Sequence, residues 1–222
     1  MNSQQKFEQM LEMQIALNDK TYPTWRTADL PWKDAIWTEC AELMDHVGWK
    51  WWKKQEPNME QARLEVVDIW HFGMSKMMVD FNESIPTLAS YLTTREQRLS
   101  DPIKMNPRTV IRALAKVAAE DMFSTPTFFD LMNSLDMSLN DLYTIYMGKN
   151  ILNTFRTENG YKEGTYIKSW HGEEDNVWLN RFVEHLNPNL EGFPVVLKKL
   201  LENKYKVVLE GEANEGRFGL GG

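Results

Sequence analysis

Cysteine is nearly absent from this sequence of 222 residues, which holds only Cys40. With no second cysteine, no disulfide can form within the chain, and such a composition is compatible with a reducing compartment. Cys40 also lies in an apolar helical pattern, whereas nucleophilic cysteines occupy exposed, electropositive sites. We therefore expect Cys40 to pack in the core and to take no part in chemistry.

The signatures of several common protein classes are missing as well. The sequence has no P-loop, no glycine-rich dinucleotide fingerprint and no internal repeat. Its amino terminus is polar, and no apolar run approaches the length that spans a membrane. The four histidines show no metal-ligand spacing, and the net charge of −7 argues against binding along polymeric nucleic acid. We expect a cytoplasmic protein that binds neither membranes nor nucleic acid polymers.

Carboxylates at helical spacing are the most informative feature that is present. Glu39 and Glu42 are three residues apart in DAIWTECAELMDHV, and Glu65 and Asp68 repeat this spacing in EQARLEVVDIWHFGMSKMM. A spacing of three puts two side chains on one face of a helix. Glu39 falls inside the apolar arc of its helix, and the second helix is apolar all round, so these side chains are expected to point inward.

Four inward carboxylates repel one another and are costly to bury unless they are protonated, paired or bound to cations. Mg²⁺ prefers oxygen ligands of this kind. Solvated carboxylates without a ligand are the alternative, since single pairs at this spacing are common on helix surfaces. Two such carboxylate pairs, both on apolar faces of adjacent helices, favour a cation site over solvated carboxylates.

A row of polar side chains marks a later helix, which is predicted to open at the capping-box-like Ser138-x-x-Asp141. Lys149, Asn153 and Arg156 share a stripe at the border of its apolar face. Two cations and an amide in this position would suit a polyphosphate. An ordinary solvated face is the alternative.

Residues 159–176 then break the helical pattern. Turn signals recur as Asn-Gly, Glu-Gly and His-Gly pairs, and Tyr161 and Lys168 lie between them. A loop with glycine hinges can act as a lid over a ligand. A β-hairpin-like connector is the alternative, and the sequence leaves both open.

These segments together resemble the dimeric dUTPases, a family of all-α nucleoside triphosphate pyrophosphatases with members in bacteria, trypanosomatids and phages. The E-x-x-E and E-x-x-D pairs fit the whole superfamily, and AELMDHVGWKWWK, RLEVVDIWHF, YMGKNILNTFR and NGYKEGTYIKSWHGEEDN narrow it. The resemblance runs from about Met10 to Asn176 and is weakest between Phe81 and Leu135. It implies an all-α multi-helix bundle and a homodimer that hydrolyses dUTP, and also dUDP, to dUMP and so keeps uracil out of DNA.

The resemblance also implies roles for individual residues. Two or more Mg²⁺ ions would bind Glu39, Glu42, Glu65 and Asp68, with Glu42 orienting or deprotonating the attacking water. Gln14 and Asn18, which by pattern alone could be surface amides, would read the uracil edge. The expected phosphate-binding residues are Lys149, Arg156, Tyr161 and Lys168, and the expected nucleotide-binding and base-binding residues are Gln14, Asn18, Trp49, Trp52, Asn153 and Asn176.

We expect one all-α catalytic domain of about eight helices over residues 1–210, with a mobile lobe at 82–137 and a flexible glycine-rich tail at 211–222. Two other functions stay open. A phage-type pyrophosphatase for dCTP and dUTP, or for another dNTP, is compatible because the Gln14 amide can present a donor or an acceptor by flipping. In a nonenzymatic helical module the carboxylates would be structural.

Overall fold

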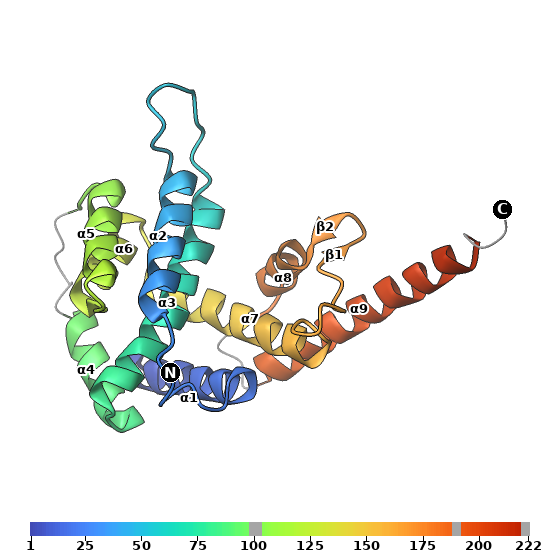
Figure 1. The fold of residues 1–222 in the computed structure, drawn as a ribbon, viewed down its shortest axis with the longest axis horizontal. Helices are drawn as coiled ribbons and strands as arrows, with labels where there is room; N and C mark the ends of the chain where they lie inside the picture. Colours follow the sequence, from blue (N-terminus) through green and yellow to red (C-terminus); the bar gives the residue numbers. More distant parts are fainter. Residues whose placement is uncertain (98–103, 188–191, 219–222) are drawn as a thin grey trace. The chain divides into compact units, whose positions relative to one another are not determined.

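The computed structural model describes residues 1–97, 104–187 and 192–218, with side chains up to residue 211 (Figure 1). These residues form nine helices and one pair of two-residue strands, which confirms the predicted all-α fold class. No helix within the described ranges is both long and apolar enough to cross a membrane. The chain divides into two compact units, Met1–Tyr146 and Met147–Gly222, and each is described by itself.

The first unit contains six complete helices and the beginning of a seventh: α1 (Ser3–Thr21), α2 (Trp32–Val47), α3 (Met59–Phe81), α4 (Ile85–Gln97), α5 (Pro107–Ala119), α6 (Thr125–Ser134) and α7 (Leu139–Glu158). α2 and α3 pack side by side, and the loop of residues 48–58 that joins them projects beyond their ends (Figure 1). Side chains of Asn2, Asn58, Asn106 and Ser124 cap helix starts, as polar N-caps are expected to do.

The core of the first unit is organised around Trp70, which is fully buried in α3. Its ring stacks on Phe128 of α6 at 4.8 Å and lies 6.1 Å from Phe7 of α1. On α2, Cys40 is buried as well, and burial raises the pKa of its thiol to about 12. The thiol therefore stays protonated at neutral pH, in keeping with its expected role in packing.

The described parts of residues 82–137, which are 82–97 and 104–137, are packed into the first unit. α4 contacts α1, α5 contacts α2, and α6 contacts both α4 and α5. Their motion as a lobe stays a prediction, as does a single domain over residues 1–210. The sequence pattern predicts a helix over residues 86–98 and a linker at 101–107, and the parts of both that fall on residues 98–103 lie outside the described residues.

Gly73 marks a close approach between α3 and the ring of Phe123, because a Cβ atom added at this glycine would overlap the ring. Gly73→Ala should therefore lower the free energy of unfolding by about 1–3 kcal/mol through overpacking, even though alanine is the better helix former. Urea unfolding measures the change. Gly192→Ala is the matched control, since nothing lies within 4 Å of its added Cβ. A Gly73→Ala protein as stable as the parent would contradict the packing.

The second unit contains the remainder of α7, β1 (Ser169–Trp170), β2 (Glu173–Glu174), α8 (Asp175–Glu184) and α9 (Phe193–Phe218). Its core is aromatic. The Phe155 and Trp170 rings both lie against Tyr205 of α9, at 5.4 and 5.6 Å, and Tyr166 stacks on the same tyrosine at 5.1 Å. These contacts join α7, the strand pair and α9.

The segment after α7 contains a short hairpin. β1 and β2 pair antiparallel with Trp170 opposite Glu173. His171 and Gly172 between them have φ of 52° and 81°, and positive φ at both positions is what a two-residue type I′ turn requires. The hairpin-like connector predicted as one alternative for residues 159–176 is therefore present at 169–174, and closure of the loop as a lid stays a prediction.

The last helix is longer than the sequence pattern predicted. The pattern of apolar residues predicts a helix over residues 195–208, whereas α9 runs from Phe193 to Phe218. Isolated glycines cost only about 1 kcal/mol each within a helix, so the segment GEANEGRF continues it. The flexibility of the tail at 211–222 stays a prediction, and residues 219–222 lie outside the described residues.

Candidate active site

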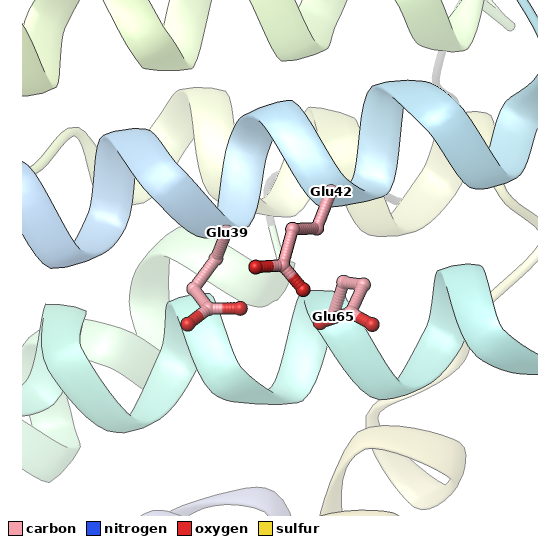
Figure 2. Close-up of side chains that lie close together, drawn as sticks. All are labelled: Glu39, Glu42 and Glu65. Carbon is pink, nitrogen blue, oxygen red and sulfur yellow. The ribbon is translucent and has the colours of Figure 1, made fainter.

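Three of the four predicted metal ligands converge between α2 and α3. Figure 2 shows Glu39 and Glu42 extending from α2 toward Glu65 on α3. Each offers a carboxylate oxygen, and these oxygens all lie within 4.8 Å of one another. Two oxygens on one Mg²⁺ lie at most about 4.2 Å apart, twice the usual bond length. The oxygen-only donor set therefore fits a hard divalent cation after a small inward movement.

Burial differs among the carboxylates of this cluster. Glu65 is 8% exposed, Glu39 is half-buried and Glu42 is exposed. Burial raises the pKa of Glu39 to about 8, and the neighbouring charges of Asp68, Glu65 and Glu42 act in the same direction. Asp68 thus lies close enough to Glu39 to affect its protonation, although it is not one of the three whose oxygens converge within 4.8 Å. A bound cation would replace the proton that Glu39 otherwise keeps.

In the metal-free protein, the free energy of unfolding should fall as the pH rises from about 5 to 8. Folded Glu39 keeps its proton up to a pH of about 8, whereas the unfolded chain releases it near the ordinary pKa of 4.5. The folded state therefore binds more protons across this window, and stability declines with pH. Glu39→Gln should remove this contribution and melt higher than the parent at pH 8.

Thermal unfolding in the presence of a chelator at both ends of this window measures the effect. The readout is the difference in melting temperature between the Glu39→Gln protein and the parent, which should be larger at the high pH. Glu60→Gln is the control, because Glu60 lies on the exposed face at the start of α3. An equal difference at both pH values would show that Glu39 ionises normally.

His46 is a member of this site that the sequence pattern did not single out. Its Nε2 lies 3.4 Å from Glu65 Oε1, so the two form an ion pair when the ring is protonated. His46 follows Glu39 and Glu42 on α2 at the spacing E-x-x-E-x-x-x-H, which puts all three on one face. This spacing to the two carboxylates is the sequence signal that identifies His46.

The predicted base-reading amides are buried in a polar network of the first unit. Gln14 is 3% exposed and Asn18 is 8% exposed. Gln14 Nε2 donates to Asn18 Oδ1 at 2.9 Å and to Ser75 Oγ at 3.2 Å, while His71 Nδ1 donates to Gln14 Oε1 at 2.7 Å. The Tyr146 hydroxyl lies 3.1 Å from the same Gln14 oxygen. These residues are core amides, and their contact with a base stays a prediction.

Trp49 and Trp52 lie in the projecting loop of residues 48–58. Their rings meet edge to face at 5.1 Å, and Trp52 in turn lies edge to face against Trp51 at 5.7 Å. Trp49 is 42% exposed and Trp52 is 56% exposed. Both rings therefore offer apolar surface to a ligand or a partner, and a base contact stays a prediction.

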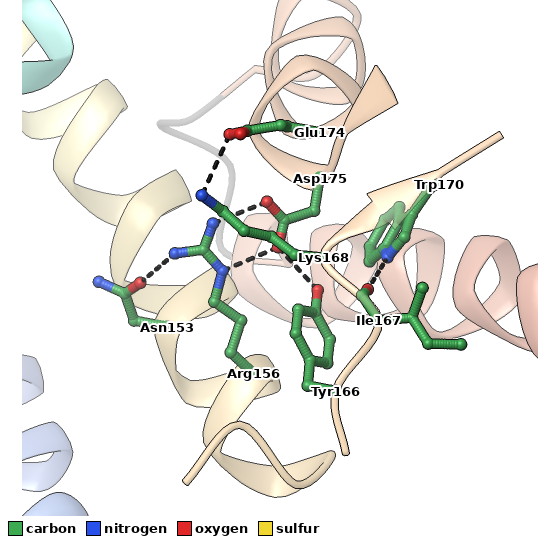
Figure 3. A network of polar contacts seen from close by, with 8 residues as sticks. All are labelled: Asn153, Arg156, Tyr166, Ile167, Lys168, Trp170, Glu174 and Asp175. Atoms are coloured by element: carbon green, nitrogen blue, oxygen red, sulfur yellow. Dashed lines mark hydrogen bonds and ion pairs between the residues drawn. The ribbon is translucent and has the colours of Figure 1, made fainter. Parts of the chain in front are cut away.

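The predicted phosphate-binding residues belong to the second unit, where Arg156 is the centre of a polar network (Figure 3). Its Nε and Nη2 donate to the two carboxylate oxygens of Asp175 at 2.8 and 2.7 Å, and its Nη1 donates to Asn153 Oδ1 at 3.1 Å. Tyr166 also donates to Asp175, at 2.8 Å. Asp175 is fully buried, so it holds the guanidinium in a fixed orientation.

The other predicted phosphate-binding and nucleotide-binding residues of the second unit differ from Arg156 in their burial and in their partners. Lys149 is 6% exposed, whereas Tyr161 is 52% exposed with the Arg156 guanidinium 5.9 Å from its ring centre. Lys168 pairs with Glu174 at 3.2 Å. Asn176, in the first turn of α8, has a buried Oδ1 that finds no hydrogen-bond partner in the part of the chain that the structure describes.

Asp175 and Tyr166 are two polar residues of this network that sequence reasoning missed. Asp175 resembles an ordinary acidic residue in the first turn of a helix, where such residues favour the helix dipole. Nothing in the sequence signals that it is buried against Arg156. Burial and the adjacent Asp175 raise the pKa of Tyr166, so its hydroxyl stays protonated and donates.

An all-α chain with carboxylates converging between two adjacent helices has the architecture of the helical nucleoside triphosphate pyrophosphatases. A family model described as dUTPase matches residues 6–161, which is most of the chain. The chain therefore belongs to the dUTPase family and is a dUTP diphosphatase. The resemblance drawn from the sequence is confirmed, and a nonenzymatic helical module is excluded. A search of curated proteins found no match to this chain.

The matched segment includes the carboxylates, Gln14, Asn18, the tryptophan loop and the predicted phosphate-binding residues up to Tyr161. Lys168 and Asn176 lie beyond it. Their roles therefore rest on their own sequence context and on their place in the second unit.

Proposed function

We propose that this dUTP diphosphatase depends on Mg²⁺, releases dUMP and pyrophosphate, accepts dUDP as well, and acts as a homodimer in the cytoplasm. The convergence of Glu39, Glu42 and Glu65 carries the proposal. Three carboxylates this close are unfavourable without a proton or a cation. A hard cation meets that need and also attracts a triphosphate.

The carboxylates would hold Mg²⁺, with Asp68 completing the set. Bound there, the ion would bind phosphate oxygens and lower the pKa of a water molecule. Glu42 is the most exposed of the three converging carboxylates and is our candidate for the residue that accepts the proton of the attacking water. Glu65, which lies beside His46, would be a further ligand.

Charge that develops on the phosphates would be neutralised by Lys149, Arg156, Tyr161 and Lys168. Arg156 keeps unused N–H groups on both Nη atoms beyond its bonds to Asp175 and Asn153, so it can contact phosphate without breaking its ion pair. Lys168 would exchange Glu174 for the nucleotide. Asn153 and Asn176 would contact phosphate or sugar, Gln14 and Asn18 the base, and Trp49 or Trp52 a face of the base.

A panel of dUTP, dUDP, dCTP, dTTP and dATP, each with Mg²⁺ or with a chelator, tests this function through the release of monophosphate, pyrophosphate and phosphate. We expect hydrolysis of dUTP and dUDP that stops on chelation and returns with added Mg²⁺. Full activity in the chelator would overturn the metal dependence.

The oligomeric state is tested by light scattering of the protein as it elutes from a size-exclusion column. A homodimer would give twice the mass of one chain, and the mass of a single chain would overturn the proposed homodimer.

A further inference from the structure

Ser75 makes three hydrogen bonds in the buried network around Gln14. It is fully buried on α3, and its hydroxyl donates to the backbone carbonyl of His71 at 2.9 Å. A serine hydroxyl has one proton, so Ser75 Oγ can only accept from its other neighbours. Those neighbours are Gln14 Nε2 at 3.2 Å and Asn18 Nδ2 at 2.9 Å.

This arrangement fixes the direction of both amide groups. Gln14 uses both N–H groups, on Asn18 and Ser75, and its oxygen faces His71 and Tyr146. Both N–H groups of Gln14 are therefore used within the protein, and His71 Nδ1 donates to its oxygen. A reversed Asn18 amide would set its oxygen against Ser75 Oγ and its NH₂ against the NH₂ of Gln14, and both 2.9 Å bonds would be lost. Little water is at hand to replace them, since Asn18 is only 8% exposed.

Of the two amides, Asn18 is the one that keeps an N–H group for a ligand among the contacts of the described residues. One N–H and one lone pair of its oxygen remain beyond its bonds to Ser75 and Gln14. Uracil presents a carbonyl oxygen next to a ring N–H, whereas cytosine presents an amino group next to a bare ring nitrogen. The two bases thus have inverted donor and acceptor positions on this edge. An amide whose direction is fixed matches one of them and leaves unpaired groups with the other.

We infer that Ser75 is a positioning residue for base choice: by accepting from both amides it holds Asn18 in the direction that pairs with uracil and rejects cytosine nucleotides. The inference rests on the proposed contact between Asn18 and the base. It also narrows the open choice between a dUTPase and an enzyme for both dCTP and dUTP, because the flipping that would admit cytosine is blocked.

The test compares kcat/KM for dUTP and dCTP in the parent and in Ser75→Ala. Without the acceptor, Asn18 can reverse, so the preference for dUTP over dCTP should shrink at least about tenfold. Ser134→Ala is the matched control, because Ser134 is also buried in the first unit and donates to a helix carbonyl, that of Leu131 at 2.8 Å. It should keep the parental preference. Ser75→Cys, nearly the same size but a weak acceptor, replaces Ser75→Ala if that protein does not fold.

The outcomes separate this inference from the proposed function. A parent enzyme that fails to hydrolyse dUTP with Mg²⁺ would overturn the proposed function and this inference with it. A parent that prefers dUTP, together with Ser75 variants of unchanged preference, would overturn the inference alone. A parent that hydrolyses dUTP and dCTP equally well would also overturn it, since the fixed amide would then select nothing.

Discussion

Glutamine in place of Glu65 should lower the turnover of dUTP by about 10²–10⁴-fold, the range that loss of a positioned catalytic group usually produces. Glu65 is the most buried of the converging carboxylates, and an oxygen of it lies within 4.8 Å of oxygens from both Glu39 and Glu42. Removing its charge would take away one ligand of the proposed cation site. Comparable losses are expected for Glu39→Gln, Glu42→Gln and Asp68→Asn.

Steady-state hydrolysis of dUTP over a range of Mg²⁺ concentrations measures these losses. Ligand variants should need more Mg²⁺ to reach half of their maximal rate, while their helical circular dichroism stays that of the parent. Glu60→Gln, at the exposed start of α3, should keep parental turnover. Near-normal turnover in two of the four variants would remove the carboxylate cluster from the mechanism.

Alanine in place of Asp175 should lower the stability of the second unit by about 3–5 kcal/mol, because it leaves a buried cation without its partner. The side chain of Asp175 is 0% exposed and that of Arg156 is 12% exposed, so solvent cannot replace the lost carboxylate. Tyr166 loses its acceptor at the same time. The release of Arg156 should also weaken nucleotide binding.

Urea unfolding followed by near-ultraviolet circular dichroism measures the loss, since the aromatic core of this unit reports on its packing. The adjacent residue supplies the matched control. Glu174 pairs with Lys168 at 3.2 Å, but both side chains are about half exposed. Glu174→Gln should therefore change stability by no more than about 1 kcal/mol. Equal losses from the two variants would mean that the Asp175–Arg156 pair contributes no more than a surface ion pair.

The fold class and the carboxylate site were predictable because both depend on local periodicity. The spacing of apolar residues determines which face of a helix is buried. A carboxylate inside an apolar arc, such as Glu39, indicates an inward position without knowledge of the fold. The end of α9 was wrong for the same local reason, since glycines in the sequence suggested a stop that the helix does not make.

The sequence alone thus determined the family, the all-α fold and the inward position of Glu39 and Glu65, whereas the tertiary structure decided which groups the polar side chains meet. Gln14 was expected to bind a base, and the structure shows the groups that its amide meets within the first unit, which are Asn18, Ser75 and His71. Arg156 was expected to face phosphate, and it is held by Asp175. Periodicity specifies the face of one helix. It carries no information about the partner, which comes from another element of the chain and is chosen by how the elements pack.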